Sequence, residues 1–331
     1  MGFASLPPRM SWRAVFRRGD GPFNAGALLL LAAFFWGSGN LANKTILSDV
    51  DPVTAVFLRA SIAALVLLLP VWLTGRHRRW PPGWLRSVAP GSLMFALALL
   101  TQQWGYQTAT VTNASFLVNA TCVLTPVLGA LFWRDRLQRR TVVSAALVLA
   151  GALLMSGAWY SLASVNLGDG LCLVSAVFYS FWIIMIGRHL ERFPTPAATT
   201  LAQCLATALL ALPVVLWIGA PAPQNLLGAL PEALYLGLFS TAAAFALMAA
   251  AQTRVSASTA AILTSAESLF GGAAGVAFLD ERPSASAWTG AGLILWAIVI
   301  MALRPEPVRT QPCPPDRRPD ADRAAFPGQA G

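Results

Sequence analysis

"AAFFWGSGNLANK", residues 32–44, places two asparagines, two glycines and a lysine at the end of a long apolar run. Asn40, Asn43 and Lys44 are three or four residues apart, so a helix carries them on one face. Trp36 extends this face by one turn. Because lipid offers such side chains no partner, we expect the stripe to face other helices, which the glycines allow to approach closely. The stripe either lines a path for a solute or only supplies hydrogen bonds between helices.

The composition of the whole chain is typical of a polytopic membrane protein. Of its 331 residues, 56% are hydrophobic and 11% are charged, whereas soluble domains carry about 25% charged residues. Clusters of proline, glycine and charge divide the chain into apolar segments of about 20 residues, the length that crosses a bilayer as a helix. We expect ten spans, at residues 25–47, 52–73, 87–106, 110–133, 140–158, 168–187, 195–218, 229–251, 255–279 and 284–303.

Charge orients these spans in the membrane. With the N-terminus placed inside, 20 of the 23 lysines and arginines fall on the cytoplasmic side. Lys44 and Arg59 lie within spans, and Arg282 falls on the outer side. Cytoplasmic loops of membrane proteins are enriched in Lys and Arg, so the net charge of +9 indicates topology rather than a nucleic-acid interface. We expect a bacterial inner (plasma) membrane protein with both termini in the cytoplasm.

The two ends of the chain differ from the spans. Residues 1–24 are basic and lack an apolar core, so we expect a cytoplasmic segment and no cleavable signal peptide. Residues 304–331 are rich in Pro, Arg and Asp and cannot bury a core, so we expect a disordered cytoplasmic tail. Between them we expect two units of five helices, residues 25–158 and 159–303.

These two units repeat each other in sequence. Each unit has an odd number of spans, so the second enters the membrane from the opposite side. Such inverted repeats build many secondary transporters, with a solute site between the halves near mid-membrane. The matches share one order and an offset of about 143 to 146 residues: "AAFFWG" at 32–37 with "SAVFYS" at 175–180, Pro52 with Pro196, Pro70 with Pro213, and "RDRL" at 134–137 with "DERP" at 280–283.

Several stretches resemble the EamA-domain proteins of the drug/metabolite transporter superfamily. "FFWGSGNLANK" resembles their first span, "NATCVLTPVLGALFWRDRL" their fourth, and residues 235–284 give the closest resemblance. The resemblance covers residues 25–303. It implies an all-α polytopic membrane protein of ten transmembrane helices in two inverted five-helix repeats, which moves small metabolites or drugs, often as efflux. The chain departs from the family at Ser268, which follows Glu267 where the second copy usually has proline.

Two cations within spans are candidates for solute contact. A cation at mid-membrane costs about 2.5–3.5 kcal/mol on insertion scales. Lys44 lies near the outer end of the first span, from which it could reach the surface, whereas Arg59 is about two turns into the second span. Either these residues anchor their helices near the surface, or they form a cationic patch in an outward cavity that attracts carboxylates.

Glu267 is the only acid deep within a span, in "TSAESLF" near the middle of the ninth. A carboxylate there requires a cationic partner, hydrogen-bond donors or a bound proton. Three roles stay open: a structural group held by a helix N-terminus or by Ser and Thr neighbours, a contact to the solute, or the site of a coupling proton.

Spans four and nine begin with small residues, in "TVTNASFLVNA" at 110–120 and "RVSASTAAILTS" at 254–265. Small residues allow close helix crossing, so we expect these two helices at the centre. Buried amides need partners, and any single aromatic residue is explained by core packing, so part of the candidate set has a structural role. The candidates for the solute path are Trp36, Asn40, Asn43, Lys44, Arg59, Gln103, Asn119, Tyr179, Trp182, Gln203 and Glu267.

These features favour a secondary transporter of small metabolites, amino acid-like or drug-like, that works by alternating access. The alternatives are a membrane scaffold or sensor subunit, and a membrane enzyme acting on lipid-linked substrates. We expect no catalytic residue, metal or cofactor, because the sequence has no phosphate-binding loop and His77 and His189 fall in basic loops without metal-ligand spacing. The expected partners are a small solute and the bilayer, not nucleic acid; a coupling proton and a homodimer stay open.

Overall fold

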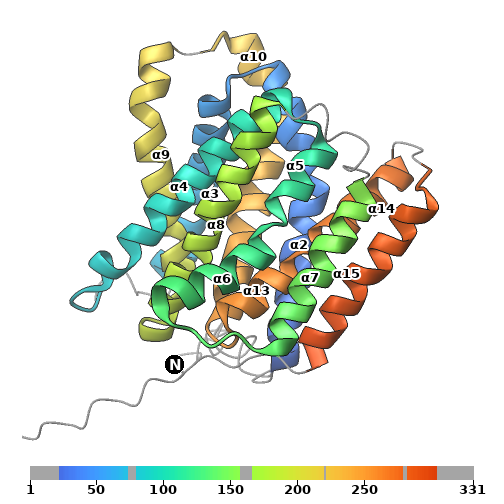
Figure 1. Cartoon of the computed structure of the whole chain (residues 1–331). Coiled ribbons are helices and arrows are strands. Elements are labelled where there is room, and N and C mark those ends of the chain that lie inside the picture. Colours follow the sequence, from blue (N-terminus) through green and yellow to red (C-terminus); the bar gives the residue numbers. More distant parts are fainter. Residues whose placement is uncertain (1–21, 74–79, 157–165, 220, 279–281, 304–331) are drawn as a thin grey trace, which may run out of the picture.

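The computed structural model describes residues 22–73, 80–156, 166–219, 221–278 and 282–303. Within these ranges every regular element is a helix, which confirms the all-α expectation. The expected disordered tail lies outside the described residues, as does the expected N-terminal segment up to residue 21. Figure 1 shows the helices gathered into one bundle.

The first half of the chain forms six α-helices, with one 3₁₀ turn after the first of them. Their bounds are α2 Pro22–Thr45, η1 Ile46–Ser48, α3 Pro52–Leu73, α4 Trp84–Thr108, α5 Val111–Val118, α6 Thr121–Trp133 and α7 Arg139–Ser156.

The second half follows the same plan, with one span that contains a π-helical stretch. Its elements are α8 Leu167–Arg192, α9 Pro196–Ile218, α10 Pro223–Gly228, α11 Leu230–Tyr235, η5 Leu236–Ala243, α12 Ala244–Gln252, α13 Ala257–Thr264, α14 Glu267–Phe278 and α15 Ala285–Leu303. In the described part of the chain, nine helical segments are long and apolar enough to cross a membrane. The expected ninth span, which contains α13 and α14, is not among them.

Two expected spans, 110–133 and 255–279, are each broken near the middle, a feature that the sequence pattern did not predict. The first is broken at Asn119, between α5 and α6, and the second at Ser265, between α13 and α14. Irregular backbone is tolerated at membrane depth only where protein buries it. Asn119 and Ser265 are 6% and 2% exposed, so both breaks lie inside the bundle.

The two breaks repeat each other in geometry as well as in position. Asn119 and Ser265 are 146 residues apart and have nearly the same backbone angles, φ −64° and ψ −12° against φ −61° and ψ −14°. The half-helices before the breaks also begin alike. Thr110 and Ser256, again 146 residues apart, each accept a hydrogen bond from the N–H three residues later. The internal repeat expected from the sequence therefore extends to the local backbone.

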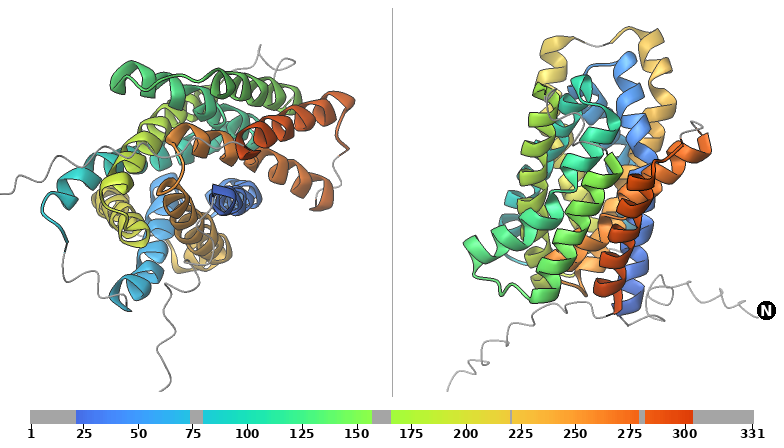
Figure 2. Two further views of the ribbon diagram at one scale, coloured as in Figure 1. Left: turned by 90° about the horizontal axis from the view of Figure 1, so that it is seen from below. Right: turned by 45° about the vertical axis from the view of Figure 1, so that its right-hand side comes forward.

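The second repeat runs through the bundle in the opposite sense to the first. Lys44, near the end of α2, donates to the backbone carbonyls of Tyr106 and Ala109 at the end of α4, at 2.5 and 3.0 Å. Asn166, which caps the start of α8, donates to the carbonyl of Thr108 in the same place, at 3.2 Å. Thus α8 begins at the end of the bundle where α2 finishes. Figure 2 shows the start of α2 and the end of α15 together at the opposite end.

The end where α2 begins carries most of the described positive charge. Exposed arginines occupy the segment between α6 and α7 at this end (Figure 1), and α8 finishes there at Arg192. We call it the arginine-rich end. Because α8 continues beyond the expected residue 187, His189 is not in a loop as we expected. It is 1% exposed within α8, with Nδ1 3.0 Å from Ser87 Oγ.

Several glycines make close helix contacts, as expected in a bilayer, where apolar surfaces gain little from meeting each other. Gly37 of α2 packs on the start of α14, where an added Cβ would lie 2.5 Å from the carbonyl oxygen of Glu267 and 2.9 Å from the nitrogen of Gly271. Gly151 of α7 packs on Gly290 of α15, whose carbonyl oxygen would lie 2.6 Å from such a Cβ. The first of these contacts brings Glu267 beside the polar stripe of α2.

The contact between α7 and α15 gives a test of this packing. Gly290→Ala should destabilise the protein by about 1–3 kcal/mol, because the new methyl overlaps the backbone of α7. Gly292→Ala on the same helix is the matched control, because nothing lies within 4 Å of its Cβ position. Thermal unfolding of the purified protein in detergent should show a lower melting temperature for Gly290→Ala only. Equal melting temperatures for the two variants would contradict the close packing of α7 on α15.

Candidate functional site

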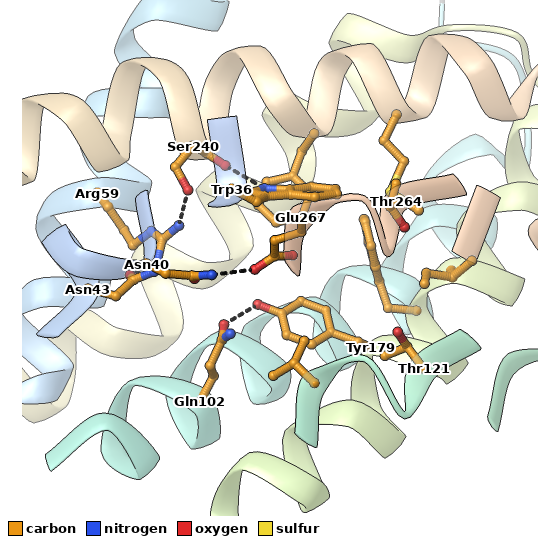
Figure 3. Close-up of a pocket in the computed structure, with 15 residues that line it drawn as sticks. Trp36, Asn40, Asn43, Arg59, Gln102, Thr121, Tyr179, Ser240, Thr264 and Glu267 are labelled. Atoms are coloured by element: carbon orange, nitrogen blue, oxygen red, sulfur yellow. Dashed lines mark hydrogen bonds between the residues drawn. The ribbon is translucent and has the colours of Figure 1, made fainter. Parts of the chain in front are cut away.

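A pocket lies at the centre of the bundle, where both broken spans meet the first helix of each repeat (Figure 3). Its cavity volume is about 60 Å³, and it is partly open. Its walls come from both repeats. The lining residues are Trp36, Asn40, Asn43, Arg59, Gln102, Val118, Thr121, Tyr179, Trp182, Ile183, Ser240, Phe245, Met248, Thr264 and Glu267.

Arg59 supplies a buried cation at one end of the pocket. Its side chain is 3% exposed. Nη1 donates to Asn43 Oδ1 at 2.8 Å, Nε to Thr241 Oγ1 at 2.9 Å and Nη2 to Ser240 Oγ at 3.2 Å. All three partners are neutral, and they use three of the five N–H groups of the guanidinium. No acidic side chain of the described residues pairs with Arg59, so its charge is not neutralised by the protein there.

Glu267 faces the same pocket without a cationic partner among the described residues. It is the first residue of α14, where the N–H groups of a helix start favour a carboxylate. Oε1 accepts a 2.8 Å hydrogen bond from Asn40 Nδ2 (Figure 3). Of the partners that the sequence left open for this carboxylate, the described structure therefore supplies hydrogen-bond donors. Arg59 and Glu267 do not form an ion pair with each other.

Asn40 connects the polar stripe of α2 to three other helices. Besides its bond to Glu267, Nδ2 donates to Ser115 Oγ of α5 at 3.0 Å, and Oδ1 accepts from the hydroxyl of Tyr106 of α4 at 3.0 Å. Asn40 and Asn43 are each 4% exposed, which confirms that this face of α2 looks into the bundle. The amide thus has a structural role and a place on the pocket wall at once.

Aromatic rings form a second part of the pocket wall. Trp36 and Trp182 both pack on Phe245, with ring centroids 4.9 and 5.2 Å apart. Hydrogen bonds fix two of the aromatic side chains. Trp36 Nε1 donates to the carbonyl of Ser240 at 2.9 Å. Tyr179, also on this wall, donates its hydroxyl hydrogen to Gln102 Oε1 at 2.7 Å. Because these bonds hold the rings in place, the wall offers a rigid apolar surface.

Seven of the eleven residues proposed from the sequence lie together on the pocket wall. They come from α2, α3, α8 and α14, which are far apart in the chain. These seven are Trp36, Asn40, Asn43, Arg59, Tyr179, Trp182 and Glu267.

Gln103 and Gln203 lie behind the wall and hold lining residues in place. Gln103 Nε2 donates to the backbone carbonyl of Asn43 at 2.8 Å. Gln203 Oε1 accepts from Trp182 Nε1 at 2.5 Å. Each amide is 1% exposed, so these residues support the pocket without lining it.

Asn119 joins the break of the first repeat to the second repeat. Its side chain donates to the backbone carbonyl of Ser115 at 2.9 Å and to the hydroxyl of Ser268 in α14. Proline, which the resembling family usually has at the position of Ser268, could not accept the second bond. Asn119 therefore ties the two broken spans together next to the pocket.

Lys44 lies outside the pocket. Its ammonium group donates to backbone carbonyls at the end of α4, including Tyr106 at 2.5 Å. The last carbonyls of a helix have no partner within it, and a cation there is favourable. Lys44 thus fastens the end of α2 to the end of α4, and it does not extend a cationic patch from Arg59.

Four polar lining residues were missed: Gln102, Thr121, Ser240 and Thr264. The repeat offset could have found one of them, since Thr121 is 146 residues before the proposed Glu267. Gln102 precedes the proposed Gln103, and only the rotation of α4 decides which amide faces inward. The apolar lining residues carry no signal in a sequence that is apolar nearly throughout.

A solute in this pocket would meet three different surfaces. Arg59 offers N–H groups and a positive charge, Glu267 offers a carboxylate, and the aromatic wall offers flat apolar area. A cation without an anionic partner is costly inside a protein, so an anionic group on a solute would be attracted to Arg59. The arrangement suits binding of a small solute that has both charged and apolar parts.

Comparison with known proteins identifies related sequences over nearly the whole described chain. The model of the EamA-like transporter family matches twice, at residues 24–157 and 166–303. The boundaries of the two matches agree with the two repeats seen in the fold.

Two relatives and one solved structure are similar to this chain. An uncharacterized transporter of Archaeoglobus fulgidus is 30% identical over 276 residues, covering 83% of this chain and 85% of its own. An uncharacterized transporter of Bacillus subtilis, YwfM, is 25% identical over 295 residues, covering 85% and 95%. A crystal structure of a protein with 20% identity superposes with a TM-score of 0.69 over 84% of this chain and 96% of that one, which shows a shared fold.

Proposed function

Since this chain belongs to the EamA-like transporter family, we propose that it moves a small solute bearing a carboxylate through the pocket between its repeats. The proposal rests on the environment of Arg59. This cation is buried, it has neutral partners only among the described residues, and it keeps N–H groups unused. Desolvating such a charge is costly unless an anion completes the site. In a scaffold nothing would offset the free energy of burying this charge, whereas in a transporter an anionic solute offsets it on binding.

The second charge in the pocket narrows the solute class. Glu267 would accept hydrogen bonds from an ammonium group, while Arg59 holds the carboxylate. The aromatic wall would then contact an apolar side chain. An amino acid-like zwitterion satisfies all three surfaces, whereas a drug-like amphiphile without a carboxylate leaves Arg59 uncompensated. We therefore favour amino acid-like solutes.

Transport would proceed by alternating access of this one pocket to the two sides of the membrane. The inverted repeat supports this mechanism, because exchanging the conformations of the two repeats converts an opening at one end into an opening at the other. We place the arginine-rich end in the cytoplasm of a bacterial cell, following the charge distribution. Efflux is the direction that the resemblance suggests.

We further propose that Glu267 carries a coupling proton. Its carboxylate lacks a cationic partner in the described structure and has a single hydrogen bond, from Asn40. A proton would neutralise the carboxylate in the empty pocket, and the ammonium group of the solute would replace that proton. One proton would then move opposite to each solute molecule.

Replacing Arg59 tests the solute class. Arg59→Met should weaken binding of amino acids about 10- to 100-fold, because hydrogen bonds to a charged group contribute about 1.5–3 kcal/mol. The measurement is a thermal-shift screen of amino acids with the purified protein, followed by titration calorimetry of the best ligand. Lys44→Met is the matched control, because it removes a cation outside the pocket. Loss of affinity in Lys44→Met with unchanged affinity in Arg59→Met would contradict the proposal.

Replacing Glu267 tests the proton. In proteoliposomes, Glu267→Gln should still exchange labelled for unlabelled solute at saturating concentration, because exchange requires no net proton movement. It should fail to accumulate solute in response to a pH gradient, because glutamine binds no proton. Glu232→Gln, an acid outside the pocket, serves as the control and should accumulate solute normally. Accumulation by Glu267→Gln at the wild-type level would show that the coupling proton binds elsewhere.

A further inference from the structure

An ion pair joins the two repeats at the arginine-rich end, between two residues that do not line the pocket. Arg188 Nη2 donates to both carboxylate oxygens of Asp135, at 2.9 and 3.0 Å. Asp135 belongs to the first repeat and Arg188 to the second. The guanidinium of Arg188 also lies over the ring of Trp133, 5.6 Å from its centroid.

The turn after α6 holds the carboxylate of Asp135 toward α8. Arg134 adopts a left-handed conformation with φ 56°, and the N–H of Asp135 bonds back to the carbonyl of Gly129 at 3.1 Å. A Cβ at Gly129 would lie 3.1 Å from Asp135 Oδ2, so the carboxylate is folded closely onto the end of its own helix. Asp135 therefore moves with α6 as one body.

α6 is a half-helix that starts at the break and finishes at this ion pair. At its start, the N–H of Cys122 bonds to the carbonyl of Asn119, only three residues back, at 3.0 Å. Its 13 residues correspond to a length of about 20 Å. Thr121, in its first turn, lines the pocket. A rotation of α6 about the break would therefore move Asp135 while changing the pocket wall only slightly.

The partner of the pair sits on a pocket helix that is not broken. α8 is continuous from Leu167 to Arg192 and carries Tyr179 and Trp182 on the pocket wall. The ion pair thus connects the far end of the hinged half-helix to a continuous helix of the other repeat.

We propose that Asp135 and Arg188 form a latch that closes the arginine-rich end of the pocket and opens when the pocket faces that side. The inference rests on the proposed transport function and adds a control element to it. The side chains of Arg188 and Asp135 are 36% and 41% exposed, and exposed pairs are weak. A latch of this strength shifts the balance between closed and open forms by about two- to fivefold, so it can break in every cycle.

The residue of the first repeat that corresponds to Arg188 is also a cation, Lys44. Lys44 is 144 residues before Arg188, within the spread of the repeat offset, and lies at the opposite end of the bundle. Its ammonium bonds backbone carbonyls of α4 and pairs with no acid of the described residues.

Access of a thiol reagent to the pocket tests the latch directly. The reporter is a cysteine on the pocket wall, introduced as Thr264→Cys in a protein that also carries Cys313→Ser. The same protein without Thr264→Cys measures the background labelling of the three described cysteines, which are buried. A membrane-impermeant maleimide is applied to vesicles that expose the arginine-rich end. Asp135→Asn should raise the labelling rate of the reporter about two- to fivefold. The exchanged pair Asp135→Arg with Arg188→Asp should return the rate toward that of the parent.

Two controls make the result decisive. Arg136→Gln removes an exposed positive charge from the same segment and should leave the labelling rate unchanged. Raising the salt concentration from about 0.05 to 0.5 M should increase labelling of the reporter in the protein that keeps Asp135 and Arg188, because salt screens exposed charges. This measurement does not depend on whether a variant at Asp135 or Arg188 folds. Unchanged labelling with Asp135→Asn, or with salt, would overturn the latch. The readout requires no solute, so it stays informative even if Arg59 does not bind a carboxylate.

Discussion

The architecture depends on a constraint of the bilayer: a backbone group that leaves its helix must find its partners inside the protein. The chain breaks two helices at corresponding positions, and both breaks are buried at the centre of the bundle. There the breaks place the first turns of two half-helices on a pocket wall instead of in lipid. Thr121 and Glu267 line the pocket for this reason.

The second consequence is a pocket whose charges are held apart. Arg59 bonds to an amide and two hydroxyls, and Glu267 bonds to an amide. Had the two charges been paired, the pocket would be neutral and would offer little to a charged solute. Holding them separately has an energetic cost, which the proposed solute offsets with its own opposite charges. Binding and conformational change can then be coupled, because the groups that hold Arg59 and Glu267 come from both repeats.

The sequence predicted the fold well and the pocket in part. Hydropathy, charge and the offset of the repeat are properties of long segments, so they indicate the positions of the spans even where a helix is broken. The polar stripe of α2 was predictable because Asn40 and Asn43 have no place in lipid. The breaks were not predictable, because neither Asn119 nor Ser265 is a strong helix breaker and the cost of breaking is recovered by tertiary contacts. The role of Lys44 depended on where α4 ends, which no local pattern reveals.

The central claim is that the uncompensated guanidinium of Arg59 binds the anionic group of the transported solute. An experimental structure of the protein with a bound amino acid tests it most directly. We predict a carboxylate oxygen within hydrogen-bond distance of Arg59, with the side chain of the solute against the aromatic wall. A solute bound outside the pocket, or inside it with its carboxylate directed away from Arg59, would contradict the account.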